Sequence, residues 1–199
     1  MEVNVALRRV YHNHMLDYIR KEQVEIAPSE EGTVDKFYLP HPAVKKEKQG
    51  ETKWGIVFDG SFHGDHLPSL NNALDMGPNL LPEILATLLR FRLYPLGILG
   101  AIGQAILQLS LNRRERDLTR IFWYRVIKDE YRNYDITRQI ITYRFTRLPF
   151  GLTCSPFILS ATVRELADMY KAEFPTEAAL VENSTFRLTS PWARKMTIV

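Results

Sequence analysis

The stretch Phe91 to Leu111, FRLYPLGILGAIGQAILQLSL, decides the fold that this sequence predicts. Apolar residues surround two glycines, Gly97 and Gly100, and charged residues begin directly after the stretch. A short apolar run of this kind, bounded by Pro95 and by charge, favours a central strand of a sheet over a surface helix. Glycine inside a strand indicates a place where another group comes close to the backbone. We therefore expect a buried strand here.

A second block, Leu148 to Leu159 (LPFGLTCSPFIL), predicts a tight turn that leads into a helix. Pro149-Phe150-Gly151 is typical of the turn, Ser155 is suited to the helix N-cap, and Pro156 to its first position. Apolar residues at helical spacing predict the buried face of a helix that ends near Phe174-Pro175: Leu159, Val163, Leu166 and Tyr170.

Periodicity predicts the remaining elements. Residues 3–22 carry an apolar stripe at helical spacing, and Leu81 to Leu93 predicts a helix with Ile84, Leu85, Leu88 and Leu89 as its core face. A hairpin is expected from Lys36 to Val44 and from Trp54 to Asp59, joined by the loop KKEKQGETK. From Asn112 to Arg120 we expect a strongly charged surface segment that forms a short helix or a turn. The β-branched and aromatic runs Ile121 to Ile127 and Gln139 to Phe145 predict an antiparallel strand pair.

Composition sets the class of protein. The chain has 199 residues, 45% of them hydrophobic and 25% charged, as in ordinary globular proteins. Its 26 basic and 23 acidic residues give a net charge of +3, which is compatible with nucleic acid as a partner. A single cysteine, Cys154, excludes an internal disulfide and fits a reducing compartment. No apolar run is long enough to cross a membrane and no signal peptide is evident, so we expect an intracellular protein.

Metal chemistry has little support in the sequence. His63, Asp65 and His66 lie within four residues, but a closed zinc site needs a second group of ligands elsewhere. Surface histidines are the simpler interpretation, and we predict no metal site.

The two blocks resemble motifs A and B of a reverse transcriptase, and their amino-acid sequences are most similar to those of retrotransposons of the BEL/Pao group. Four further stretches match in the family's order, over roughly residues 10 to 186: Tyr38 to Val44 (YLPHPAV), Thr52 to Ser61 (TKWGIVFDGS), Ser69 to Leu85 (SLNNALDMGPNLLPEIL) and Leu88 to Leu93 (LLRFRL). The resemblance implies an α+β right-hand polymerase with fingers, an incomplete palm, an antiparallel sheet and packed helices. It divides the chain into an N-terminal helix and loop (1–35), a fingers-like region (36–95), a partial palm with motifs A and B (96–186) and a non-homologous tail (187–199).

The activity that the resemblance implies is RNA-directed DNA synthesis with magnesium held between carboxylates. In the family, the motif A strand carries a metal-binding aspartate, and here that position is Ala101. Paired aspartates are expected in a later hairpin, but no carboxylate occurs from Arg187 to the end of the sequence. The sheet is therefore expected to end before that hairpin, leaving an open edge. Without these ligands we predict no cofactor for this chain.

The resemblance also implies the lining of a nucleotide pocket. Ile106 stands at the aromatic position of motif A, Phe150 and Gly151 form the motif B turn, and Gly55 replaces an arginine that grips the triphosphate. Basic residues of the fingers and palm are candidates for contact with an RNA or DNA template-primer: Lys45, Lys46, Lys53 and Arg144. From the residues alone, the hairpin lysines fit a solvated tip better than a phosphate contact, because Glu47 and Glu51 lie among them, and only the resemblance favours the contact.

These observations predict a truncated, degenerate remnant of a reverse transcriptase without catalytic activity. Two other hypotheses stay open. One is a nucleic-acid-binding module that keeps the fingers surface but not the chemistry. The other is a transposon relic with no function.

Overall fold

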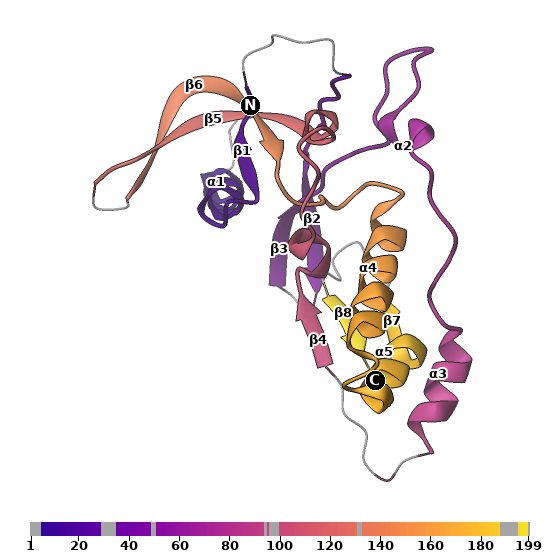
Figure 1. Ribbon diagram of the computed structural model, residues 1–199. Helices are drawn as coiled ribbons and strands as arrows, with labels where there is room; N and C mark the ends of the chain where they lie inside the picture. Colours follow the sequence, from indigo (N-terminus) through magenta and orange to yellow (C-terminus); the bar gives the residue numbers. More distant parts are fainter. Residues whose placement is uncertain are drawn as a thin grey trace. The chain divides into compact units, whose positions relative to one another are not determined.

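The computed structural model describes residues 5–28, 35–48, 51–93, 95, 100–130, 133–187 and 195–198. The chain combines helices with small antiparallel sheets (Figure 1), so the predicted α+β class is confirmed. It forms two compact units. The first unit contains Met1–Leu74 and Ser110–Leu152, and the second contains Asp75–Leu109 and Thr153–Val199. Each unit mixes residues from several of the four predicted regions, whose boundaries stay a prediction.

The first unit begins with helix α1 (Val5–Arg20), which confirms the predicted N-terminal helix. Its apolar stripe faces inward, since Met15 and Tyr18 are almost completely buried. Tyr18 lies edge-on to Phe58 at 5.5 Å between ring centroids, and Phe58 lies edge-on to Phe145 at 4.8 Å. Edge-to-face rings of this kind add to the stabilisation that burial provides.

A three-stranded antiparallel sheet forms the rest of this core, in the order β1-β6-β5. Its strands are β1 (Val24–Ile26), β5 (Arg120–Lys128) and β6 (Tyr134–Phe145), so the predicted strand pair is confirmed. The charged segment before β5 contains a turn and a short 3-10 helix, η2 (Arg116–Thr119), as predicted, but its expected surface position is wrong in part, because Asp117 and Thr119 are buried.

The predicted hairpin exists, but its predicted bounds are wrong. Strand β2 is Ala43–Lys48 and strand β3 is Glu51–Ile56, so most of the expected loop KKEKQGETK lies within the strands. Charged and polar residues fill most of the two strands, AVKKEK and ETKWGI, which pair from Ala43 and Ile56 to Lys48 and Glu51. Apolar patterning therefore did not mark these strands.

In the second unit, helix α3 (Ile84–Phe91) confirms the predicted helix in a shorter form. The predicted core face is wrong, because Ile84, Leu85, Leu88 and Leu89 are between 47% and 65% exposed. The buried residue of this helix is Thr87, which donates its hydroxyl to the carbonyl oxygen of Glu83. An apolar stripe on a helix tells which face is apolar but not whether another element covers it.

The stretch Phe91 to Leu111 is only partly a strand, and the expectation of a buried strand is wrong, since Gly100 has no atom near the place of a Cβ and Ile102 is 39% exposed. Strand β4 is Gly100–Gly103, and Gln104 then adopts a left-handed backbone with φ of 53°. A 3-10 helix, η1 (Ala105–Gln108), follows and buries Ala105, Ile106 and Leu107. The left-handed residue ends the strand. Leu96, Ile98 and Leu99 lie outside the described residues.

The expectation that the sheet ends before its last hairpin is wrong. Strands β7 (Thr185–Arg187) and β8 (Lys195–Ile198) form an antiparallel pair, and β8 also pairs with β4, giving the order β4-β8-β7. The region 187–199, predicted to be a non-homologous tail, thus supplies a strand to this sheet. Backbone groups of β4 need partners, and Lys-Met-Thr-Ile can provide them without any acidic residue.

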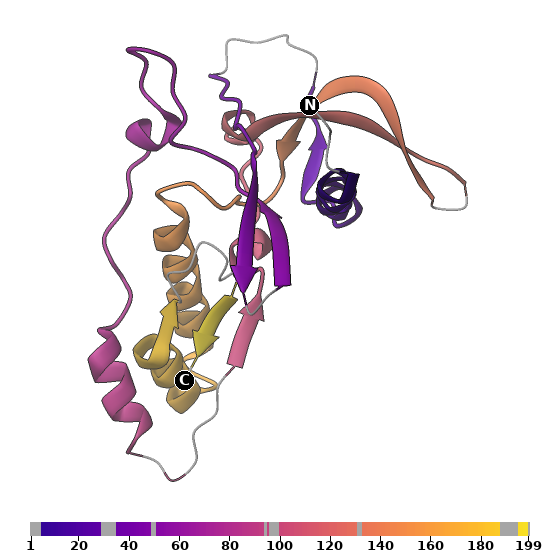
Figure 2. The ribbon, with the colours of Figure 1, turned by 180° about the vertical axis from the view of Figure 1, so that it is seen from behind.

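Helices α4 (Ser155–Tyr170) and α5 (Pro175–Ser184) lie side by side in the second unit (Figure 2). The N-cap of α4 is Cys154 rather than the predicted Ser155, so Pro156 occupies the second helical position. Leu159 is buried as predicted, but Leu166 and Tyr170 are about half exposed, at 54% and 50%. None of the described helices is long and apolar enough to cross a membrane.

Candidate functional site

The motif A position lies within the sheet of the second unit. Ala101 pairs directly with Thr197 across β4 and β8, and Ile102 pairs with Met196. The three strands read GAIG, TFR and KMTI, so they contain no aspartate or glutamate. Across the described residues as a whole, no group of three histidine, cysteine or acidic residues could hold a metal ion. This sheet offers backbone amides and carbonyls but no charged oxygen ligand.

Ile106, the other candidate of motif A, is packed inside the second unit. It is only 3% exposed and belongs to η1 rather than to an extended strand. A side chain in this state contributes to the core. The structure gives it no exposed surface for a ligand.

The motif B turn belongs to the first unit and requires its glycine. Gly151 has φ of +96°, and a Cβ atom at this residue would lie 1.9 Å from the carbonyl oxygen of Phe58. The predicted tight turn is present, and the group that comes close to Gly151 is the backbone of Phe58; its place in a nucleotide pocket stays a prediction. Phe150 is half-buried beside it, and Gly55 is buried in β3 opposite Val44.

Asn71 contacts this turn from another part of the chain, and no sequence pattern predicts that contact. Its amide nitrogen donates to the carbonyl oxygen of Gly151 at 3.0 Å and to the hydroxyl of Ser61 at 2.8 Å. It sits in helix α2 (Leu70–Ala73), whose N-cap Ser69 forms a reciprocal capping box with Asn72. The Ser-Leu-Asn-Asn sequence could have indicated the capped helix, but not the distant turn that it contacts.

The basic candidates of the hairpin lie on strands. Lys45 forms an ion pair with Glu47 at 2.5 Å, and both side chains are largely exposed. Lys46 and Lys53 are paired residues in the backbone register, and their side chains lie outside the described part of the chain. An exposed pair such as Lys45 and Glu47 is weak in water, so Lys45 can exchange its partner for a phosphate.

Arg144, the fourth basic candidate, belongs to a buried network of ion pairs in the first unit. It donates to Asp117 Oδ2 at 3.0 Å and to Glu25 Oε1 at 2.8 Å, and its side chain is 14% exposed. Arg120 donates to the other oxygen of Asp117 at 2.9 Å, and Arg116 contacts Glu25 at 3.1 Å. These ion pairs account for Arg144 within the fold, and the structure offers no support for it as a nucleic-acid contact.

Two opposing effects act on Asp117 in this network. Burial would raise the pKa of its carboxyl, but the hydrogen bonds and positive charges of Arg120 and Arg144 outweigh it, and the pKa falls below its ordinary value. The carboxylate is thus ionised at neutral pH and holds two strands and the preceding turn together.

Histidine and tyrosine also meet inside the first unit. The hydroxyl of Tyr11 contacts His41 Nδ1 and donates to the His41 carbonyl oxygen, while His41 Nε2 lies 3.0 Å from the carbonyl oxygen of Phe122. Burial lowers the pKa of His41 and raises the pKa of Tyr11 to about 12. Both groups are neutral at physiological pH and join α1 to the sheet.

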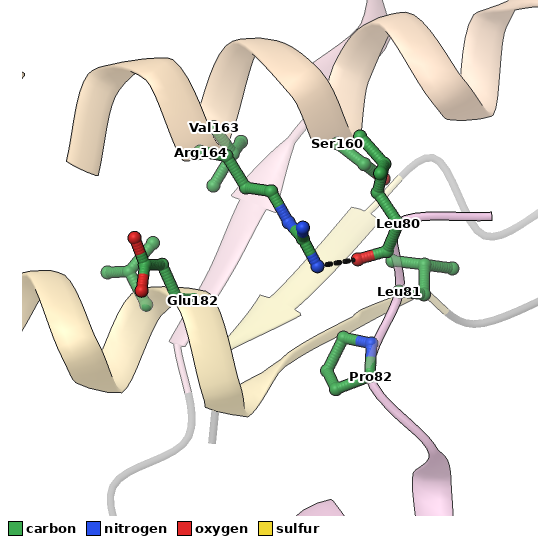
Figure 3. A pocket seen from close by; sticks show the side chains of 8 residues that line it. Leu80, Leu81, Pro82, Ser160, Val163, Arg164 and Glu182 are labelled. Carbon is green, nitrogen blue, oxygen red and sulfur yellow. Dashed lines mark hydrogen bonds between the residues drawn. The ribbon is translucent and has the colours of Figure 1, made fainter. Parts of the chain in front are cut away.

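A small cavity in the second unit lies between α4, α5 and residues 80–82 (Figure 3). Arg164 reaches across it and donates to the carbonyl oxygen of Leu80, with Glu182 and Ser160 on its walls. Its volume of about 10 Å³ leaves room for one water molecule. It is too small for a nucleotide.

The predicted site residues therefore fall into two groups. Ala101 and Ile106 belong to the second unit, whereas Lys45, Gly55, Phe150 and Gly151 belong to the first. No protein-family model matches the chain, and no curated protein matches it.

Proposed function

We propose that this chain descends from a reverse transcriptase of the BEL/Pao group and has lost the capacity for nucleotidyl transfer. The proposal rests on the ordered motif blocks of the sequence. The observation that carries the loss of activity is the pairing of Ala101 with Thr197 in a sheet whose strands contain no carboxylate.

The strand order supports this ancestry. A polymerase of this class needs acidic residues from motif A and from a later hairpin to meet on adjacent strands, where they hold two metal ions. Here β4 carries the motif A position and β8 lies directly beside it, with β7 completing a hairpin. The order of these strands suits a metal site, but the acidic side chains that would bind the metal are replaced.

The chemical consequence is large. Two magnesium ions stabilise the attacking and leaving oxygens by several kcal/mol, and roughly each 1.4 kcal/mol changes the rate tenfold. Alanine has no oxygen ligand, and threonine offers a neutral hydroxyl that binds a hard cation weakly. We therefore expect template copying to be undetectable.

Nucleotide incorporation tests the proposal. The purified chain is incubated with a labelled primer on an RNA template, deoxynucleotides and magnesium, beside an active reverse transcriptase as the positive control. The wild-type chain is expected to extend no primer. Ala101→Asp is also expected to be silent, because a single restored carboxylate cannot hold two ions. Magnesium-dependent extension by the wild-type chain would overturn the proposal.

A second candidate function is nucleic-acid binding without catalysis, and one contact of the first unit favours it. The ring of Phe122 stacks on Tyr38 with centroids 4.6 Å apart and planes 9° apart, while Phe122 stays 52% exposed. Arg120 donates to the hydroxyl of Tyr38 at 3.2 Å and holds that ring in place. An exposed ring supported from behind is suited to stack on a base.

Filter binding of a labelled primer-template tests this second candidate. Binding should weaken steeply as salt rises, and Phe122→Leu should weaken it about tenfold, because leucine lacks the flat face of a ring. Ile140→Ala is the matched control, since Ile140 is also exposed on this strand pair and is not aromatic. No measurable binding at low salt would discard this function.

A further inference from the structure

Phe122 of β5 has a different neighbour on each side across the sheet of the first unit. Its side chain is 52% exposed and points to the face opposite the buried Trp123, because successive side chains of a strand alternate. Tyr38 adjoins it from the segment that runs along the outer edge of β5. On the other side, Thr142 of β6 is its directly paired residue, so the two side chains share one face.

The two sides of the Phe122 ring are unequally filled. The ring of Tyr38 covers one side, with planes 9° apart. The other side has only the small side chains of Thr142 and of Ala27, whose N–H donates to the carbonyl oxygen of Thr142 at 2.9 Å. Adjacent strands lie about 4.8 Å apart, close to the 4.6 Å between the ring centroids of Tyr38 and Phe122. A flat ring standing over Thr142 would therefore stack on the second side of Phe122.

A buried ion pair holds the supporting ring in place. Arg120 is 2% exposed, donates to the hydroxyl of Tyr38 at 3.2 Å, and places its guanidinium carbon 5.9 Å from the centre of that ring. Asp117 accepts a hydrogen bond from Arg120 at 2.9 Å and so fixes the guanidinium. Both residues position Tyr38 from below, and a ligand would meet a ring pair that is already assembled.

We propose that Phe122 stacks on one unpaired base of a single-stranded nucleic acid, which stands over Thr142, with Tyr38 as the supporting ring. The inference rests on the nucleic-acid binding described above as the second candidate function, and it names the substrate class. A base within a duplex is covered on both faces by its neighbours, whereas an unpaired base offers a face to the ring. Every base has such a face, so DNA and RNA strands share the chemistry.

Fluorescence anisotropy with two probes tests the proposal. One probe is a labelled strand of about 12 nucleotides, and the other is the same strand annealed to its complement, each made as DNA and as RNA. At low salt, the wild-type chain is expected to bind the single strand about tenfold more tightly than the duplex. The preference should hold for both kinds of nucleic acid.

A substitution beside Phe122 locates the base. Thr142→Leu fills the place over Thr142 and should weaken binding of the single strand about tenfold, while binding of the duplex stays unchanged. Thr137→Leu is the matched control, because it makes the same exchange on β6 away from Phe122 and should bind both probes like the wild type. Circular dichroism establishes that each variant keeps its fold.

Two substitutions of Tyr38 test its positioning role. Tyr38→Phe keeps the ring but loses the hydrogen bond to Arg120, so single-strand binding should weaken about threefold. Tyr38→Leu removes the ring and should weaken it about tenfold. Binding of the duplex should not change in either variant, whereas a merely structural role would lower the affinity for both probes together.

The outcomes separate this inference from the function on which it rests. Equal affinity for the single strand and the duplex would overturn the inference but leave nucleic-acid binding in place. Single-strand binding by Thr142→Leu at the wild-type affinity would do the same. If the wild-type chain binds neither probe at low salt, both the binding function and the inference are wrong.

Discussion

Ala101 of β4 and Thr197 of β8 are directly paired residues, although 96 positions separate them in the chain. Neither residue carries a carboxylate, and the three strands of this sheet, GAIG, TFR and KMTI, contain no aspartate or glutamate.

Gly151→Ala should destabilise the first unit by at least about 3 kcal/mol, because the new Cβ atom would collide with the backbone of Phe58 in a left-handed conformation. Urea unfolding followed by tryptophan fluorescence measures this change. Gly64→Ala is the matched control, since its Cβ atom would meet Leu67 at an ordinary 3.5 Å. Equal midpoints for the two variants would show that the turn is not tight.

Asp117→Asn should cost about 3 kcal/mol of unfolding free energy, because it removes the carboxylate that the two buried arginines Arg120 and Arg144 share and leaves Arg144 with Glu25 alone. Asp168→Asn removes an exposed pair with Lys171 and should cost less than about 1 kcal/mol. Denaturant titrations of both variants beside the wild type give the comparison. A small effect at Asp117 would mean that water replaces its partners.

Acid should weaken the first unit through the same carboxyl. The folded pKa of Asp117 lies below its ordinary value of 3.8, so the unfolded chain binds the proton first as pH falls. The stabilisation is complete above pH 4 or so and is lost as pH falls through the folded pKa. In Asp117→Asn, the slope of unfolding free energy against pH in this range should be smaller than in the wild type.

His41 should give a second pH dependence at a higher pH. Burial lowers its pKa below the ordinary 6.5, so the unfolded chain takes up a proton that the folded chain refuses. Stability should fall as pH drops below 6.5, and His12 acts in the same direction because burial and Arg8 lower its pKa as well. His41→Gln should flatten the dependence measured by thermal unfolding. An unaltered profile in His41→Gln would contradict this role.

The sequence predicted elements whose pattern is local. Helix α1 follows from an apolar stripe at helical spacing, and β5 and β6 follow from runs of β-branched and aromatic residues. Strands β2 and β3 were misplaced because charged and polar residues fill most of both strands, so no apolar alternation indicates them. A local sequence pattern predicts the secondary structure of a segment, but not which other segments pack against it.

The features that sequence reasoning missed depend on distant partners. Asn71 contacts Gly151 across 80 positions, and β8 becomes a strand because β4 and β7 offer it hydrogen bonds. The face of α3 was misassigned for the same reason, since an apolar stripe does not specify its cover. Of the candidate site, the tight glycine turn and the missing acidic residue could be read from the sequence. The ion pairs of Arg144 with Glu25 and Asp117 could not be read from it.

Binding of manganese, followed by the electron paramagnetic resonance of the free ion, tests most directly whether this sheet can hold a catalytic metal. A variant with Ala101→Asp and Thr197→Asp places two carboxylates at these paired positions, and Ala101→Asn with Thr197→Asn is its uncharged control. We expect the wild-type chain and the asparagine variant to leave the free-ion signal unchanged, and the aspartate variant to lower it. Saturable loss of that signal with the wild-type chain, at one or two ions per chain, would contradict the account.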